Sequence, residues 1–80
     1  MEVYKGKIYK HYKGNIYIVE DIAQHTETDE MLVIYRALYA DCKLYARPMS
    51  MFVEVLDKYN QEKFGQVHRF ELVEIPSNKK

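Results

Sequence analysis

The chain has few of the residues that characterise several common kinds of protein. Its 80 residues include one cysteine, which excludes an internal disulfide framework and favours a reducing compartment. The three glycines are scattered, so no phosphate-binding glycine loop is present. No apolar run approaches the roughly 18 residues of a membrane span, and the first residues contain no apolar signal core. We therefore expect a cytoplasmic protein with no membrane partner.

Neither sign of charge is in excess, because 12 lysines and arginines balance 12 acidic residues. This balance excludes a domain-wide electrostatic attraction to nucleic acid or anionic lipid. Hydrophobic residues make up 48% of the chain and charged residues 30%, which is typical of a globular fold. Eighty residues can build only one core. We predict a single small β domain over residues 1–80, with its core at about 7–75 and a frayed tail at 76–80.

Apolar and polar residues alternate along much of the chain, and such alternation indicates strands. In the strand predicted over residues 16–24, we expect Ile16, Ile18 and Ile22 on one face. The polar residues 26–30 are interpreted as a hairpin loop, with a short helical turn as the alternative. The predicted strands cover residues 7–12, 16–24, 31–39, 44–47, 52–56 and 69–74.

Two segments favour helical turns. Pro48 can begin a helical turn over residues 49–51. Residues 57–67 form either a helical turn that ends at Gly65 or a long loop. Short strands in so small a domain must close or fold over to hide their edges. We therefore predict an all-β fold, a small SH3-like barrel of five to six short antiparallel strands with one short helical turn.

Lysines alternate with tyrosines near the N-terminus, and no acidic residue separates them between Tyr4 and Tyr17. Cations beside aromatic rings are typical of single-stranded nucleic-acid binding. The favoured interpretation is that the lysines protect an edge strand from pairing. Because acidic residues follow closely from Glu20, we expect weak nucleic-acid binding or none. The residues concerned are Lys5, Lys7, Lys10 and Lys13, with Tyr4, Tyr9, Tyr12 and Tyr17.

The segment 20–30 is acidic and contains His25. Carboxylates and an imidazole can bind a divalent cation, but structural zinc needs four ligands at a recognisable spacing, and the chain has no such set. A solvated acidic loop is favoured, so we predict no metal site and no cofactor. A hydrolase-like enzyme would need Cys42 close to His25 or His68, and no motif brings them together. We predict no catalytic residue.

Arg36 is the charged residue that most requires an explanation. It shares a predicted strand face with the apolar Ile34 and Leu38, so it must be paired or lie at the mouth of a cleft. The favoured interpretation is an internal ion pair with Glu54 or Glu71.

A ligand site is the alternative interpretation of the arginines. Arginine binds carboxylate or phosphate oxygens through its planar fork, and a tyrosine beside it can stack on a ligand ring. Because consecutive strands often pair, we predict that Arg36, Tyr45 and Arg47 line one cleft, with His25 near it. The predicted function is a non-catalytic binding module for an anionic ligand, either a small molecule such as a nucleotide or a nucleic acid. A protein-interaction domain or homo-oligomer subunit is the alternative, and a small hydrolase-like enzyme is less favoured.

Several short motifs occur in order along residues 7–56. They are His11-Tyr12-Lys13-Gly14, His25-Thr26-Glu27-Thr28, Val33-Ile34-Tyr35-Arg36-Ala37-Leu38-Tyr39, Arg47-Pro48 and Met51-Phe52-x-Glu54. In these motifs the chain resembles a small bacterial family catalogued as a domain of unknown function. The resemblance implies a compact β domain and no accepted activity. The family usually has tryptophan where this chain has Tyr45, and glycine where it has Ala40.

Overall fold

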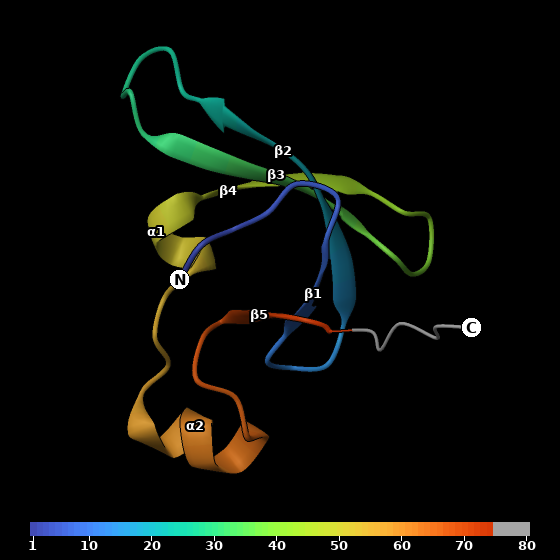
Figure 1. Cartoon of the computed structure of the whole chain (residues 1–80), viewed down its shortest axis with the longest axis vertical. Coiled ribbons are helices and arrows are strands. Elements are labelled where there is room, and N and C mark those ends of the chain that lie inside the picture. Colours follow the sequence, from blue (N-terminus) through green and yellow to red (C-terminus); the bar gives the residue numbers. More distant parts are fainter. Residues whose placement is uncertain (75–80) are drawn as a thin grey trace, which may run out of the picture.

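The computed structural model describes residues 1–74, so the predicted frayed tail at 76–80 lies outside the described residues. Five strands and two short helices follow each other along the chain. The strands are β1 (Ile8–His11), β2 (Ile16–Gln24), β3 (Met31–Ala37), β4 (Leu44–Pro48) and β5 (Phe70–Leu72), and the helices are α1 (Met49–Phe52) and α2 (Lys58–Phe64). The strands form one antiparallel sheet in the order β4-β3-β2-β1-β5 (Figure 1).

The sheet is open within the described part of the chain. β4 and β5 lie at its two ends, and each pairs with one neighbouring strand only. The fold is therefore mostly β, as predicted, but closure into an SH3-like barrel is not confirmed. Between β4 and β5 the chain passes through both helices before it returns beside β1 (Figure 1).

Both helices begin and end for local reasons. Pro48 precedes the first residue of α1, and its restricted backbone is compatible with the start of a helix. Phe52 belongs to this helix, so the predicted strand over 52–56 is wrong, and only Val55 makes an isolated bridge there. The Asp57 carboxylate accepts a hydrogen bond from the Asn60 amide at the start of α2, and Gly65 ends this helix in the left-handed conformation. The helical interpretation of 57–67 is confirmed.

A β-bulge in β2 changes which side chains share a face. The register of β2 against β3 shifts between Val19 and Asp21, which leaves Glu20 as an extra residue. Beyond the bulge, Ile22 pairs with the buried Val33. The prediction that Ile22 lies on the same face as Ile16 and Ile18 is therefore wrong, because one inserted residue reverses the alternation.

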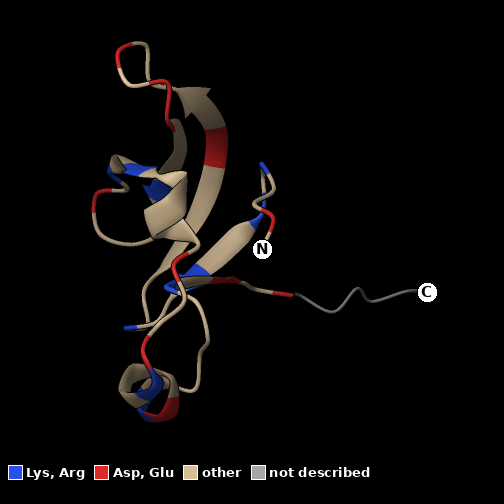
Figure 2. Ribbon diagram, turned by 90° about the vertical axis from the view of Figure 1, so that its left-hand side faces the viewer, with Lys and Arg blue, Asp and Glu red and all other residues tan. Residues whose placement is uncertain are grey.

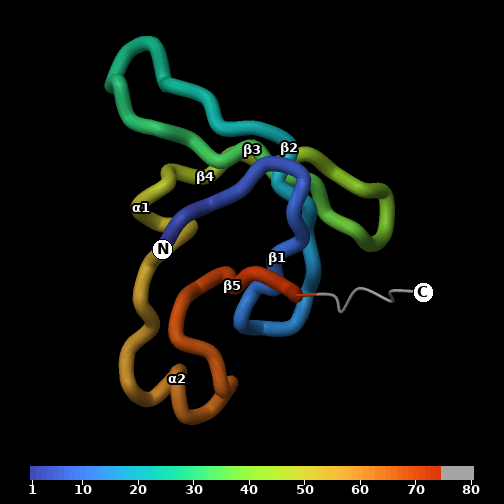
Figure 3. Tube along the Cα trace, viewed as in Figure 1, coloured from blue at the N-terminus to red at the C-terminus, as the bar shows by residue number. Residues whose placement is uncertain are grey.

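The core covers one face of the sheet and is rich in aromatic rings. The rings of Phe52 from α1 and Phe70 from β5 are stacked with their centroids 4.1 Å apart, and both side chains are fully buried. The N-terminal segment runs from beside α1 to β1 (Figure 3), and Val3 packs against the core. The other members of the core are Tyr9, Tyr17, Val19, Val33, Tyr35 and Ala37. Among the described residues, no helix is long and apolar enough to cross a membrane.

Candidate functional site

The lysine–tyrosine segment at the N-terminus does not form a binding surface of its own. Tyr9 is fully buried and Tyr17 nearly so, and neither ring can therefore stack on a ligand. The interpretation of the lysines as edge protection is also wrong, because β1 lies between β2 and β5 inside the sheet. Of the four tyrosines, Tyr4 and Tyr12 remain accessible.

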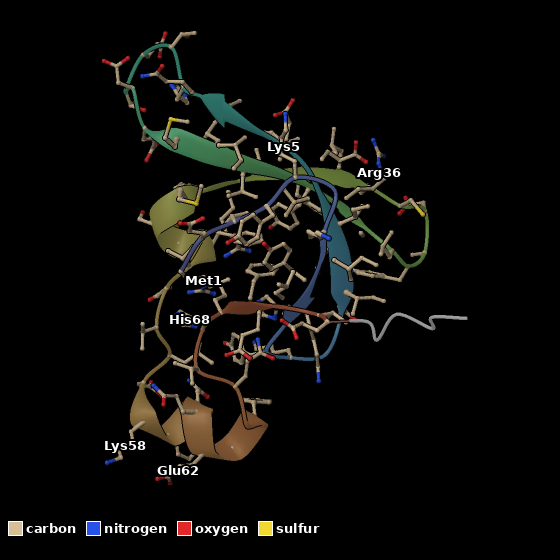
Figure 4. All side chains as sticks on the ribbon, in the orientation of Figure 1. Met1, Lys5, Arg36, Lys58, Glu62 and His68 are labelled. Carbon is tan, nitrogen blue, oxygen red and sulfur yellow. The ribbon has the colours of Figure 1, made fainter. Side chains whose placement is uncertain are left out.

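The two predicted site arginines lie on opposite faces of the sheet. Arg47 pairs with Val33, which faces the core, whereas Arg36 pairs with Leu44 and Ile18. Since residues 33 and 36 of one strand point to opposite sides, the two guanidinium groups cannot share a site. In Figure 4, Arg36 points away from the side of the sheet where β5 lies. The predicted common cleft is therefore wrong.

Arg36 binds groups of its own chain. Its Nε donates to a carboxylate oxygen of Glu20 at 2.9 Å, and its Nη1 donates to the carbonyl oxygen of Cys42 at 2.9 Å. The predicted partners were Glu54 or Glu71, and both are wrong: the bulge brings Glu20 beside Arg36 instead. The side chains of Arg36 and Glu20 are 40% and 42% exposed. Such an exposed pair contributes about 1 kcal/mol or less to stability.

Glu54 and Glu71 have other partners. Glu54 forms an ion pair with Arg69, which also donates to the Met51 carbonyl oxygen. Glu71 accepts hydrogen bonds from the backbone amides of Val67 and His68. Glu71 of β5 thus holds the segment between α2 and β5, and Glu54 joins Arg69 of that segment to the loop between α1 and α2.

His25 lies in the turn between β2 and β3, beside Glu30, whereas Arg47 of β4 pairs with Val33, three residues further along the chain, on the other side of β3. Its Nδ1 accepts hydrogen bonds from the amides of Glu27 and Thr28, so its local role is to hold the turn. Figure 2 shows acidic residues at this hairpin tip. Within residues 1–74, no group of three or more His, Cys, Asp or Glu side chains could hold a metal ion. The structure thus gives His25 a turn-holding contact and does not place it beside the arginines.

Arg47 and Tyr45 lie together on the core side of β4, as residues two apart on one strand must. The Arg47 Nε donates to the Tyr35 hydroxyl at 3.1 Å, and its guanidinium carbon lies 5.5 Å from the centre of the Phe70 ring. No carboxylate within the described part of the chain forms an ion pair with Arg47. A half-buried guanidinium therefore lies on an aromatic surface without a protein counter-charge.

His11 completes this group, which we call the Arg47 cluster: Arg47, Tyr45, Tyr35, Phe70 and His11. The imidazole lies edge-on to Phe70 at 4.9 Å, and its Nδ1 accepts a hydrogen bond from the Lys13 amide. Burial, followed by the positive charges of Arg47, Arg69 and Lys13, lowers the pKa of His11 to about 4. His11 is therefore neutral near pH 7, with its proton on Nε2.

Tyr45 provides the accessible ring of the Arg47 cluster. Its side chain is 40% exposed, and its ring centre lies 5.7 Å from that of Tyr35. Nearby, the Tyr17 and Tyr39 hydroxyls form a hydrogen bond of 2.8 Å, and burial raises the pKa of Tyr17 to about 12. Tyr17 is therefore a neutral phenol, and Arg47 provides the charge of the Arg47 cluster.

Comparison with known proteins places the chain in a family. Residues 7–72 match the family described as "Protein of unknown function (DUF1653)". The chain belongs to this family. It is similar to the crystal structure of a DUF1653 protein from Bordetella bronchiseptica, with 29% sequence identity, 95% of each chain covered and a TM-score of 0.71. The comparison with curated proteins gave no match.

The cysteine of this DUF1653 domain does not meet a histidine. Cys42 is exposed in the loop between β3 and β4. His68 precedes β5, and its Nδ1 lies 3.8 Å from a carboxylate oxygen of Glu71. His25 holds its own turn, as described above. The arrangement needed for a cysteine nucleophile is thus absent from the described residues.

A depression of about 460 Å³ lies elsewhere on the DUF1653 domain, beside β1 and β5. It is lined by Gly6, Lys7, Ile8, Leu72, Val73 and Glu74. It contains none of the predicted site residues and none of the Arg47 cluster. His11 was not among the predicted site residues, although it is the first residue of the His11-Tyr12-Lys13-Gly14 motif.

Proposed function

We propose that this DUF1653 domain is a non-catalytic binding module for an anionic ligand with an aromatic base, a nucleotide or a nucleic acid, and that Arg47 and Tyr45 bind it. The observation that carries the proposal is the state of Arg47. Its charge has no carboxylate partner among residues 1–74, whereas Arg36 and Arg69 are each paired with a glutamate. A ligand phosphate is the counter-charge that this position accepts.

The rest of the Arg47 cluster supports the same ligand. Tyr45 offers an accessible ring beside the guanidinium, suited to stack on a base. His11 is neutral, so its Nε2 can donate a hydrogen bond without a charge of its own. The Tyr35 hydroxyl bonds to Arg47 and fixes its orientation.

The connections of the sheet support an SH3-like arrangement that is open between β4 and β5. The first four strands pair in sequence, β5 returns beside β1, and α1 follows β4 directly. Arg47 of β4 lies over the ring of Phe70 of β5. On this inference the ligand binds where the two edge strands approach each other.

The test is a nuclear magnetic resonance titration of the ¹⁵N-labelled protein with thymidine 5′-monophosphate. We expect the amides of β4 to shift, and Arg47→Gln to weaken binding about tenfold or more because a charged hydrogen bond to phosphate is lost. Arg36→Gln is the matched control, since it removes an arginine from the opposite face. Equal weakening by both substitutions would contradict the proposal, and so would a wild-type domain that binds neither this mononucleotide nor a short oligodeoxythymidylate.

A protein-interaction function predicts a different result in the same experiment. Aliphatic side chains are exposed on the face of the sheet opposite the core, among them Ile16 and Leu44. If this face formed a dimer, shifts would depend on protein concentration and would occur there without any nucleotide.

A further inference from the structure

The surface around Arg47 continues beyond β4. We propose that an aromatic–cationic stripe runs from β4 to α2 and binds a single strand of nucleic acid, rather than a mononucleotide alone. This inference rests on the proposed function and extends its site. We define the stripe by four accessible rings and three cations: Tyr45, Tyr12, Phe64 and Tyr59, with Arg47, Lys13 and Lys63.

A continuous series of ring contacts connects the two ends of the stripe. The consecutive ring centres are 5.7, 5.4, 4.9, 4.6 and 5.1 Å apart. The series runs from Tyr45 through Tyr35, Phe70, His11 and Tyr12 to Phe64. Because Tyr35 and Phe70 are buried, they act as rigid supports, and the accessible rings on either side can stack on bases.

Cations lie beside the rings along the whole series. The Lys13 ammonium is 5.7 Å from the centre of the Tyr12 ring, and the Lys63 ammonium is 5.4 Å from Phe64. Lys63 is also 5.7 Å from the ring of Tyr59, one helical turn earlier in α2. The stripe therefore alternates a ring for a base with a cation for a phosphate, which single-stranded nucleic acid requires.

The pairing of charges separates this surface from the opposite face. None of the three stripe cations forms an ion pair with an acid of residues 1–74. On the opposite face, Arg36 is paired with Glu20, and Lys5 is paired with Asp21. The chain as a whole has a formal net charge of zero, but the positive charges of the stripe are not paired with acidic side chains of the described residues.

Helix α2 supplies both test residues and a matched control. Tyr59 is 69% exposed, so its substitution should not disturb the core. Figure 4 shows Lys58 and Glu62 pointing away from the body of the protein. Lys58→Gln is therefore the control for Lys63→Gln, and Tyr4→Ala, at an exposed tyrosine outside the stripe, is the control for Tyr59→Ala.

The experiment measures fluorescence anisotropy of a labelled oligodeoxythymidylate of about ten nucleotides, a length within the range bound by one small β domain. We expect it to bind more tightly than thymidine 5′-monophosphate. Tyr59→Ala should weaken binding of the oligonucleotide about fivefold or more, because a stacked base is lost. Lys63→Gln should also weaken it and reduce the slope of log affinity against log salt by about 0.7.

The two controls should leave oligonucleotide affinity unchanged, and no α2 substitution should alter binding of the mononucleotide. If Arg47→Gln weakens both ligands while Lys63→Gln and Tyr59→Ala weaken neither, the stripe is overturned and the proposed function stands. If neither ligand binds the wild-type domain, both proposals are overturned.

Discussion

At the scale of single residues, the loop between β3 and β4 contains two residues other than glycine whose backbone conformation is unfavourable. Ala40 has a φ of 52° and Cys42 a φ of 54°, both in the left-handed region that favours glycine. The loop places the Cys42 carbonyl oxygen beside Arg36. The hydrogen bond that it accepts from the Arg36 guanidinium stabilises this backbone conformation.

We predict that Ala40→Gly stabilises the domain by about 0.5–1 kcal/mol, because glycine adopts a positive φ without the steric cost of a Cβ. Urea denaturation followed by circular dichroism measures the change. Ala46→Gly is the control: it lies in β4, where glycine weakens a strand by a similar amount in the opposite direction. If the two substitutions changed stability in the same direction, the explanation from φ would fail.

His11 makes stability depend on pH. The pKa of the folded group is about 4, below its ordinary value of 6.5. Between these two values the unfolded chain binds more protons than the folded chain, so the free energy of unfolding falls as the pH falls. The stabilisation is fully present above pH 6.5 and is lost progressively towards pH 4.

We predict that His11→Asn reduces the loss of stability between pH 7 and pH 5, because asparagine can still accept the Lys13 amide but does not titrate. Urea denaturation of both proteins at the two pH values gives the comparison. The chain has three histidines, so only the difference between wild type and variant isolates His11. An identical loss in both proteins would show that burial of this imidazole is not the cause.

At the scale of elements, helix α2 carries part of the proposed nucleic-acid stripe and is weakly anchored to the rest of the domain. None of its residues is fully buried, and it depends on the Asp57 carboxylate at its first turn and on Gly65 at its end.

Asp57→Ala should destabilise the helix by about 1 kcal/mol, since an N-cap hydrogen bond is lost. Hydrogen exchange should become faster in the amides of α2 and stay unchanged in β2 and β3. Asp57→Asn keeps the acceptor and should retain slower exchange; uniform acceleration across the sheet would contradict this local role.

The sequence predicted the regular elements better than their junctions. The bounds of β2 agree with the prediction over 16–24, because this segment is rich in β-branched residues and lies between a glycine-containing turn and the polar residues 26–30. The bulge at Glu20 escaped prediction because apolar residues occupy both predicted faces of this strand, so the sequence pattern does not show where the alternation reverses. The strand predicted over 52–56 became helix α1 and a loop, because burial of Phe52 satisfies either a strand or a helix end.

In the candidate site too, the sequence predicted relations within one strand better than relations between strands. Tyr45 and Arg47 share a face of β4, which the sequence indicates because residues two apart on a strand point to the same side. Whether Arg36 and Arg47 lie on the same face of the sheet depends on the register between β3 and β4. The loop between these strands sets that register, and the alternation of apolar residues alone does not predict it. His11 and Lys63 were missed because they come from β1 and α2, and only the folded chain brings β1 beside β5 and Phe64 of α2 against Tyr12.

At the scale of the whole molecule, an open sheet needs something to cover its core face. Phe52 and Phe70 do this from opposite ends of the sheet order: α1 follows β4, and β5 is the other edge. Their stacked rings, together with Tyr9 and Tyr35, form the contact that joins the two edges. The same Phe70 ring supports Arg47, so the core and the candidate site depend on one side chain.

We therefore predict that Phe70→Ala destabilises the domain by about 3–5 kcal/mol through loss of a fully buried ring. A chain of 80 residues has a total stability of only about 4–12 kcal/mol, so this variant should lose a large part of its stability and unfold at a much lower urea concentration. Phe70→Leu keeps most of the apolar volume, and we expect it to fold with a smaller loss while removing the ring beneath Arg47. Proton NMR dispersion and urea midpoints separate the two cases. A well-folded Phe70→Ala with an unchanged midpoint would mean that the two edges are held together elsewhere, because no ring at position 70 would then be needed to join them.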